Sequence, residues 1–164
     1  MTRDAHRHDP ALARALSRLP SGVYVLTAGR GAAATGMLVT WVQQVGFEPP
    51  AVAVALRKGR AIEPLIRGDG AFCLAVLDGD GRAMLRHFAR GFEPGADAFA
   101  GVEIAMCALG IPYPRAALAH LACRVRGVAA DWTDHVVVCG EVAAGDGVLE
   151  REPMVHVRKN GFSY

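Results

Sequence analysis

The stretch of sequence that decides the fold runs from Gly36 to Arg60, GMLVTWVQQVGFEPPAVAVALRKGR. Residues 36–41 are mostly apolar, with the β-branched and aromatic side chains that are typical of a strand. Glu48-Pro49-Pro50 interrupts this pattern, because a proline has no N–H to donate to a sheet ladder. Residues 51–56, AVAVAL, follow as a second and almost purely apolar strand. The stretch therefore predicts two buried strands separated at the prolines.

Polar residues inside this stretch suggest more than packing. Trp41, Gln43 and Gln44 place large, polar-edged side chains among apolar ones, which a purely structural role explains less well. The second strand ends in Arg57-Lys58-Gly59-Arg60, where three cations lie within four residues. Cations beside a glycine at a strand end can bind an anion such as a phosphate. A solvated strand end gives the same pattern, and these residues alone favour that simpler interpretation.

Length and composition limit the class of protein. With 164 residues the chain is expected to be one domain, long enough to bury roughly 70% of its unfolded surface. It is 52% hydrophobic and 21% charged, and no apolar run approaches the roughly 20 residues of a membrane span. The surplus of apolar residues predicts an oligomer interface. The net charge of +2 is too small to indicate binding to nucleic acid or to an anionic membrane.

The cysteines and the N-terminus indicate the cellular compartment. The four cysteines are Cys73, Cys107, Cys123 and Cys139. They lie far apart without a zinc-like pairing, and three are in apolar runs where a cysteine is usually a small buried residue. Residues 1–10 carry charge without a following apolar stretch, so they do not resemble a secretory signal. We expect a cytoplasmic protein without a metal site, with a flexible N-terminal segment at residues 1–10 and one domain at residues 11–164.

The pattern along the whole chain predicts short strands and few helices. Apolar or alternating runs predict strands at residues 23–28, 36–41, 51–56, 71–77, 119–128, 136–142 and 154–158. Helical spacing predicts helices at residues 11–18 and 82–89 and a helical turn at 61–66, while residues 102–113 stay ambiguous. In the last strand, apolar and basic residues alternate as in a half-buried strand. Because βαβ alternation is absent, the pattern predicts a mainly β, antiparallel barrel or sandwich.

Motifs leave the chemistry open. The sequence has no P-loop, G-x-G-x-x-G, G-x-S-x-G or H-E-x-x-H motif. Asp134-His135 is the one acid–histidine pair before a strand, and a histidine there suits ligand binding or proton transfer as well as a simple turn. His156 lies between two valines, where a packed core histidine is the simpler interpretation. The residues alone therefore indicate a small β-rich domain with a candidate anion site and two unassigned histidines.

Taken as a series, several segments closely resemble the flavin reductase-like family. They are GMLVTWVQQVGFEPPAVAVALRKGRAIEPLI, AFCLAVL, MLRHFARGFEPGADAFAGVE, DWTDH and PMVHVRKNGFSY, in that order. The resemblance covers residues 11–164 and is specific, because WVQQ-x-x-FEPP and FEPGADAFAGVE occur together. It is strongest with the flavin reductase module at the C-terminal end of diflavin flavoproteins. The resemblance implies the fold of that family, an antiparallel FMN-binding split β-barrel that forms a homodimer.

The resemblance also implies an activity and a set of site residues. The family binds FMN or FAD at a homodimer interface and reduces it with NADH or NADPH, which implies an NAD(P)H:flavin oxidoreductase. Position by position, His135 becomes the catalytic residue. The implied cofactor-binding residues are Met37, Leu38, Val39, Thr40, Trp41, Gln43, Gln44, Arg57, Lys58, Arg60, Ala75, Asp134, His156, Arg158 and Tyr164. The three cations after the second strand match the family's phosphate-binding segment, which favours the anion site over the solvated strand end.

Three functions follow from the resemblance and from two departures. The leading hypothesis is a reductase that supplies reduced flavin or electrons to a monooxygenase or a flavodiiron-type protein. Thr133 replaces the glycine of the family's GDH motif, which supports a flavoredoxin-like FMN electron carrier without NAD(P)H activity. Ala75 stands where relatives commonly have Asn, which supports a split barrel that has lost flavin and serves as a binding module.

Overall fold

The structure, a computed structural model, describes residues 9–162. Its helices are α1 (Pro10–Ser17), α2 (Ile62–Asp69) and α3 (Arg82–Phe88), with a short 3-10 turn η2 (Gly31–Ala33). Its strands are β1 (Ser21–Gly22), β2 (Tyr24–Ala28), β3 (Thr35–Val39), β4 (Val42–Phe47), β5 (Pro50–Arg57), β6 (Ala71–Val76), β7 (Ile104–Met106), β8 (Pro112–Pro114), β9 (Ala119–Ala130), β10 (His135–Gly147) and β11 (Val155–His156).

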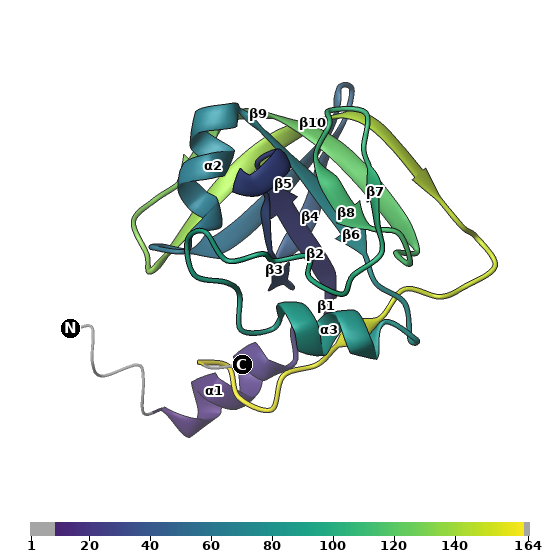
Figure 1. Ribbon diagram of the computed structural model, residues 1–164. Helices are drawn as coiled ribbons and strands as arrows, with labels where there is room; N and C mark the ends of the chain where they lie inside the picture. The colour runs from purple at the N-terminus through teal and green to yellow at the C-terminus, as the bar shows by residue number, and fades with distance from the viewer. Residues whose placement is uncertain (1–8, 163–164) are drawn as a thin grey trace.

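A single antiparallel sheet makes up most of the molecule. It has seven strands in the order β3-β2-β6-β9-β10-β5-β4, and β1 with β11 and β7 with β8 form two small additional sheets. The edge strands β3 and β4 are consecutive in the chain, separated by Thr40 and Trp41 alone. The sheet must therefore curl until its two edges meet, which gives the barrel seen in Figure 1. The predicted mainly β, antiparallel architecture is confirmed.

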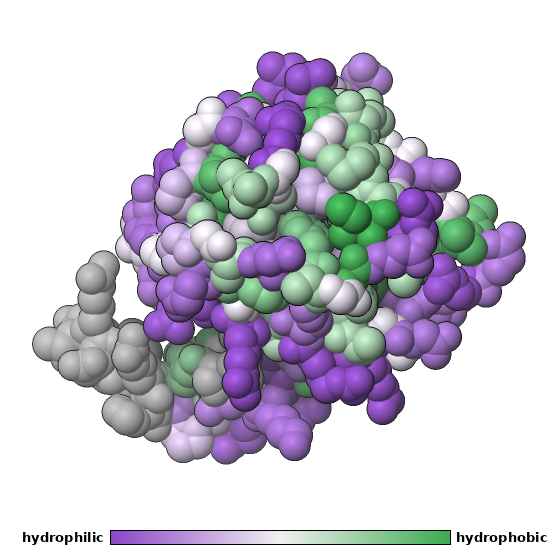
Figure 2. All heavy atoms as spheres, viewed as in Figure 1, coloured by the Kyte–Doolittle hydropathy of each residue, from purple (hydrophilic) through white to green (hydrophobic). Residues whose placement is uncertain are grey.

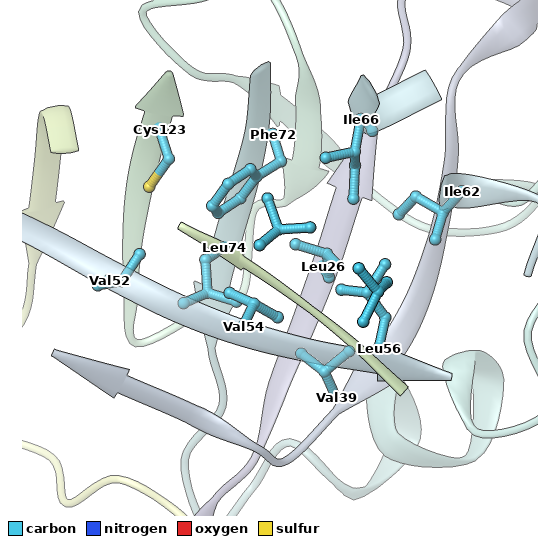
Figure 3. Packing of buried hydrophobic residues seen from close by; sticks show 13 residues of the cluster. Leu26, Val39, Val52, Val54, Leu56, Ile62, Ile66, Phe72, Leu74 and Cys123 are labelled. Carbon is cyan, nitrogen blue, oxygen red and sulfur yellow. The ribbon is translucent and has the colours of Figure 1, made fainter. Parts of the chain in front are cut away.

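The barrel interior is filled by inward side chains of the strands. Figure 3 shows Val54 and Leu56 of β5 beside Leu26 and Leu74, with Ile62 of α2 closing one side. Each such side chain contributes about 1.5–3 kcal/mol when fully buried. Figure 1 shows α2 at one end of the barrel and α1 and α3 at the other end.

The helix boundaries follow from local signals. Asp9 begins α1, because its Oδ1 accepts hydrogen bonds from the N–H groups of Ala11 (2.8 Å) and Leu12 (3.2 Å). α2 extends to Asp69, beyond the predicted turn at residues 61–66. Pro64 does not interrupt it, because a proline in the first turn removes no intrahelical hydrogen bond. Gly70, at φ 63°, ends the helix in the left-handed conformation that glycine adopts readily.

The structure corrects one strand prediction and assigns a region that the sequence left ambiguous. The predicted strand at residues 36–41 ends at Val39, and a separate strand, β4, begins at Val42 and pairs with β5. Trp41 thus lies at the corner between strands rather than within one. The ambiguous residues 102–113 contain β7 and most of β8, which form a hairpin in which Ile104 pairs with Pro114.

The predicted half-buried strand at residues 154–158 is wrong in both length and orientation. Its strand part is limited to β11, and Val155 and Val157 are 65% and 52% exposed, whereas Arg158 is only 8% exposed. The Arg158 guanidinium donates to the backbone oxygens of Leu16 (3.1 Å) and Gly161 (3.2 Å). These hydrogen bonds offset part of the cost of burying a charged group, and only Nε of the guanidinium has no hydrogen-bond partner within residues 9–162. The basic side chain therefore turns inward and the valines turn outward.

Candidate functional site

A groove of about 450 Å³ lies on the outside of the barrel. Its lining residues are Pro20, Ser21, Gly22, Tyr24, Thr40, Trp41, Val42, Gln43, Ala53, Ala55 and Val137. The groove exists because β5 alternates, with Val52, Val54 and Leu56 pointing into the core and the small alanines between them pointing outward. Small residues on the outer face leave room that larger side chains would fill.

Trp41 joins the groove to two residues from distant parts of the chain. Its ring lies 4.7 Å from the His135 ring, centroid to centroid, at an interplanar angle of 44°. The Arg158 guanidinium also lies on the Trp41 ring, with its central carbon 5.2 Å from the ring centroid. A buried guanidinium over an indole is a favourable cation–π pair. The structure thus brings Trp41, His135 and Arg158, all predicted site residues, into one cluster.

His135 begins β10 and is oriented by its neighbours in sequence. Its Nδ1 lies 3.0 Å from Asp134 Oδ1, and its backbone N–H donates to Thr133 Oγ1 over 3.1 Å. The contact with His135 holds the pKa of the Asp134 carboxyl below its ordinary value of 3.8. A carboxylate beside Nδ1 fixes the orientation of the imidazole ring. Proton exchange is then left to the second ring nitrogen, Nε2. Thr133 therefore supports the turn that positions His135.

The predicted phosphate cations are exposed, and none of them lines the groove. Lys58 is paired with Asp131, with Nζ 2.6 Å from Oδ1, and this hydrogen bond lowers the pKa of the Asp131 carboxyl. The positive charge of Arg57 contributes to the lowered pKa of Asp134. Arg60 instead lines a small recess of about 20 Å³ beside Met37. The three cations therefore lie in two places. Arg57 and Lys58 lie at the end of β5 near Asp134 and Asp131, and Arg60 lies beside β3.

The other predicted cofactor residues differ in accessibility. Val39 and Thr40 are buried, and Ala75 is fully buried among core residues such as Val25 and Phe88. Met37 and Leu38 are half-buried against two different hydrophobic clusters, and the Gln43 and Gln44 amides donate to nearby backbone oxygens. His156 pairs with Ser21 between β11 and β1, which places it next to the groove. Tyr164 lies outside the described residues, and the assignment of this set to a cofactor stays a prediction.

Sequence reasoning missed several groove residues, and Ser21 is the most informative. Its Oγ is buried and has no hydrogen-bond partner within residues 9–162. Because a buried hydroxyl normally has a partner, an unpaired one beside a groove indicates a place for a ligand's polar atom. No sequence signal identified Ser21. For Ala53 and Ala55 the signal was present, since small residues alternate with valine through AVAVAL.

Two other kinds of site are absent from the described part of the chain. There, no group of three or more His, Cys, Asp or Glu side chains could hold a metal ion. None of the helices at residues 9–162 is long and apolar enough to cross a membrane.

Comparison with known proteins shows the family. A sequence model described as "Flavin reductase like domain" matches residues 16–163. Diflavin flavoprotein A 1 of Synechocystis sp. is 38% identical over 159 residues, which are 95% of this chain and 27% of that protein. The chain thus spans about a quarter of the length of that relative.

Solved structures share the fold. NADH:FAD oxidoreductase SgcE6 of Streptomyces globisporus superimposes with a TM-score of 0.81 and 29% identity, covering 88% of this chain and 85% of that one. The same protein in complex with NAD and FAD fragments gives a TM-score of 0.79 at 27% identity, covering 92% and 87%. Nitrilotriacetate monooxygenase component B from Mycobacterium thermoresistibile gives 0.78 at 29% identity, covering 88% and 79%. The predicted resemblance and the split-barrel fold are confirmed.

Proposed function

Because this chain belongs to the flavin reductase-like family, we propose that it is an NAD(P)H:flavin oxidoreductase that binds FMN or FAD in the groove beside Trp41. The single observation that carries the proposal is the groove itself, which has small apolar walls, a buried hydroxyl without a partner among residues 9–162, and the Trp41 ring that His135 contacts. SgcE6, at a TM-score of 0.81, is named an NADH:FAD oxidoreductase, which supports the same class of reaction.

The residues of the groove fit a flavin ring. A flavin is flat and apolar on its faces, with hydrogen-bonding atoms along its edge. The groove volume of about 450 Å³ lies within the 300–1,000 Å³ that is common for ligand pockets. Ala53 and Ala55 form an apolar wall without bulk, and the Ser21 Oγ provides a hydrogen-bonding group that has no partner within residues 9–162. When bound, the flavin would accept a hydride from the nicotinamide of NADH or NADPH.

The chain's own residues would orient the reactants rather than react covalently. Asp134 orients the His135 imidazole, which is 14% exposed at its side chain and can exchange a proton at Nε2. Arg158 and His135 both contact the Trp41 ring at the groove. Such positioning is a large part of catalysis when two planar rings must meet at reacting distance.

We assign the flavin phosphate to the exposed cations Arg57, Lys58 and Arg60. Exposed ion pairs are worth only about 0–1 kcal/mol, so a phosphate can compete with Asp131 for Lys58. The assignment rests on the position of these cations at and directly after the end of β5, the strand whose Ala53 and Ala55 line the groove.

We also propose a homodimer and a partner that uses the reduced flavin. Ala51, Ala53 and Ala55 of β5 and Val137 and Cys139 of β10 are only half-buried, which leaves an apolar strip on the outside of the barrel. A second copy covering this strip would also close the groove. Diflavin flavoprotein A 1 and nitrilotriacetate monooxygenase component B are proteins whose names link this family to larger flavin-dependent systems, which supports an oxygenase or flavodiiron-type partner.

The test is anaerobic mixing of the purified, FMN-loaded protein with NADH and, separately, with NADPH, followed at the absorbance of oxidised flavin. Rapid bleaching by either nucleotide supports the reductase and identifies the hydride donor. Bound flavin that neither nucleotide reduces would mean an electron carrier, and failure to bind FMN or FAD would mean a binding module. The Ser21→Ala variant should weaken flavin binding roughly 5–10-fold, as expected for one lost hydrogen bond of about 1 kcal/mol.

A further inference from the structure

The turn between β9 and β10, residues 131–134, is anchored at both ends and carries an exposed indole between its anchors. At the start of the turn, Lys58 Nζ lies 2.6 Å from Asp131 Oδ1 and donates to Asp131 O over 2.9 Å. At its end, the Lys58 N–H donates to Asp134 O over 3.1 Å. Trp132, between them, is 78% exposed. The turn therefore holds a large aromatic surface in solvent, where burial against the protein does not explain it.

The outer face of the groove continues along the sheet toward this turn. Ala55 and Val137 are directly opposed where β5 pairs with β10, and both line the groove. Two residues further along each strand, Arg57 lies opposite His135. Opposed residues share a face of the sheet, as do residues two apart in a strand, so Arg57 and His135 extend the groove face. From Val137 to Trp132 the chain covers five residues, at most about 18 Å.

The surroundings of Trp132 suit a nucleotide better than a protein surface. Figure 1 shows the turn beside α2, and Arg67 of that helix lies 3.7 Å from Asp131 Oδ2. Figure 2 shows mostly hydrophilic residues on this side of the molecule, whereas apolar residues gather over the β7–β8 hairpin. A protein interface places several apolar and aromatic side chains together at its centre. A nucleotide base instead stacks on one aromatic ring, while cations beside the ring bind its phosphates.

We propose that Trp132 is the stacking surface for the adenine of a dinucleotide, FAD or NAD(P)H, whose pyrophosphate lies beside Arg57. The inference rests on the proposed function, because the flavin or nicotinamide ring of the same dinucleotide would lie in the groove. The indole offers a flat face to the adenine, and the Arg57 guanidinium offers paired donors to a phosphate. FMN has no adenosine, so Trp132 would favour a dinucleotide over FMN.

The test compares ligands that differ by their adenosine portion, with dissociation constants measured by calorimetric titration of the full chain. Trp132→Ala should weaken FAD binding roughly 5–100-fold, as expected for one lost base–aromatic stack, and should leave FMN binding within about twofold of wild type. Trp132→Phe keeps an aromatic ring and should retain most of the FAD affinity. If the adenine belongs to the nicotinamide substrate, the loss appears for NADH and not for reduced nicotinamide mononucleotide.

Phe47→Ala is the matched control, because Phe47 is 89% exposed and lies beside the opposite end of β5, where it pairs with Pro50. It should change none of these dissociation constants. Equal weakening of FMN and FAD in Trp132→Ala, or unchanged binding of both FAD and NADH, would overturn the proposal. A changed oligomeric state of Trp132→Ala in sedimentation would also overturn it, by assigning the indole to a second copy.

Failure of the proposed function gives a different result from failure of this inference. If the wild-type protein binds neither FMN nor FAD, the proposed flavin site is wrong, and titration with AMP and NADH still tests Trp132. Binding of either nucleotide that Trp132→Ala weakens and Phe47→Ala preserves would support the adenine site. Wild-type protein that binds neither AMP, NADH nor FAD would overturn it.

Discussion

β5 and β6 look alike in sequence and differ in the folded protein. Both place large residues inward and small residues outward, with Phe72 and Leu74 of β6 matching Val54 and Leu56 of β5 in the core. The outward residues of β6, including Cys73 and Ala75, are covered by the β7–β8 hairpin and by the aromatic loop after α3. The outward alanines of β5 are only half-buried and line the groove. The same small-residue pattern is thus structural where a chain segment covers it and available for a ligand or a second copy where none does.

The largest effect is expected inside the barrel. Phe72→Ala should lower the free energy of unfolding by about 3–5 kcal/mol, because the Phe72 ring fills the core against Gly140, where a Cβ would lie 2.6 Å from the ring. Urea denaturation measures this change. The exposed Gln44→Ala is the control, expected within about 0.5 kcal/mol of wild type. Equal effects of the two substitutions would contradict the assignment of the core.

A matched pair tests the two outer faces directly. Ala75→Phe on β6 should cost about 1–3 kcal/mol of stability or more, because the added ring has no space in a fully buried cluster. Ala55→Phe on β5 should leave stability nearly unchanged but lower FMN affinity at least tenfold, since the ring would fill the groove. Denaturation and quenching of FMN fluorescence measure the two effects. Full FMN affinity in Ala55→Phe would place the flavin elsewhere.

A third comparison uses the chain's two tryptophans, Trp41 and Trp132. Trp41→Ala should destabilise the protein by about 1–2 kcal/mol, because it removes the cation–π contact of the buried Arg158. It should also slow flavin reduction, since His135 loses its ring contact. Trp132, 78% exposed, should be replaceable by Ala with a change under about 0.5 kcal/mol. In the Trp132→Phe variant, Trp41 is the one remaining tryptophan, so quenching of its fluorescence by FMN reports on its distance from the flavin. Fluorescence that FMN leaves unchanged would mean that Trp41 does not lie near the bound flavin.

The smallest effect concerns pH. Asp134 has a lowered pKa in the folded state. Its contact with His135 therefore stabilises the protein fully at pH values above 3.8, the ordinary pKa, and this stabilisation is lost as the pH falls through the lower, folded-state pKa. Because the Asp134 side chain is 70% exposed, solvent screening limits the contribution to about 0.5 kcal/mol or less. Comparing Asp134→Asn with wild type in low salt should show a larger difference in stability at pH 6 than at pH 3. A difference that survives in 1 M salt would contradict a screened surface interaction.

Much of the candidate site could be predicted because its signals are local or belong to the family pattern. Trp41 stood out as a polar-edged residue among apolar ones, and Asp134-His135 as the one acid–histidine pair before a strand; the structure brings Trp41 and His135 into contact. Ser21 could not be predicted, since its importance lies in a hydroxyl without a partner, which depends on β11 pairing with β1 from the far end of the chain. The alternation in the tail was visible but misread, because hydrophobicity alone predicts that valines point inward.

The sequence by itself determined the strands, the antiparallel class and the start of α1, because hydrophobic periodicity, prolines and helix caps act over a few residues. Only the tertiary structure decided which small-residue face is covered, that Arg158 turns inward onto Trp41, and that Cys107 meets Cys73. Burial and hydrogen-bond satisfaction depend on residues brought together from distant positions, and no local pattern contains that information.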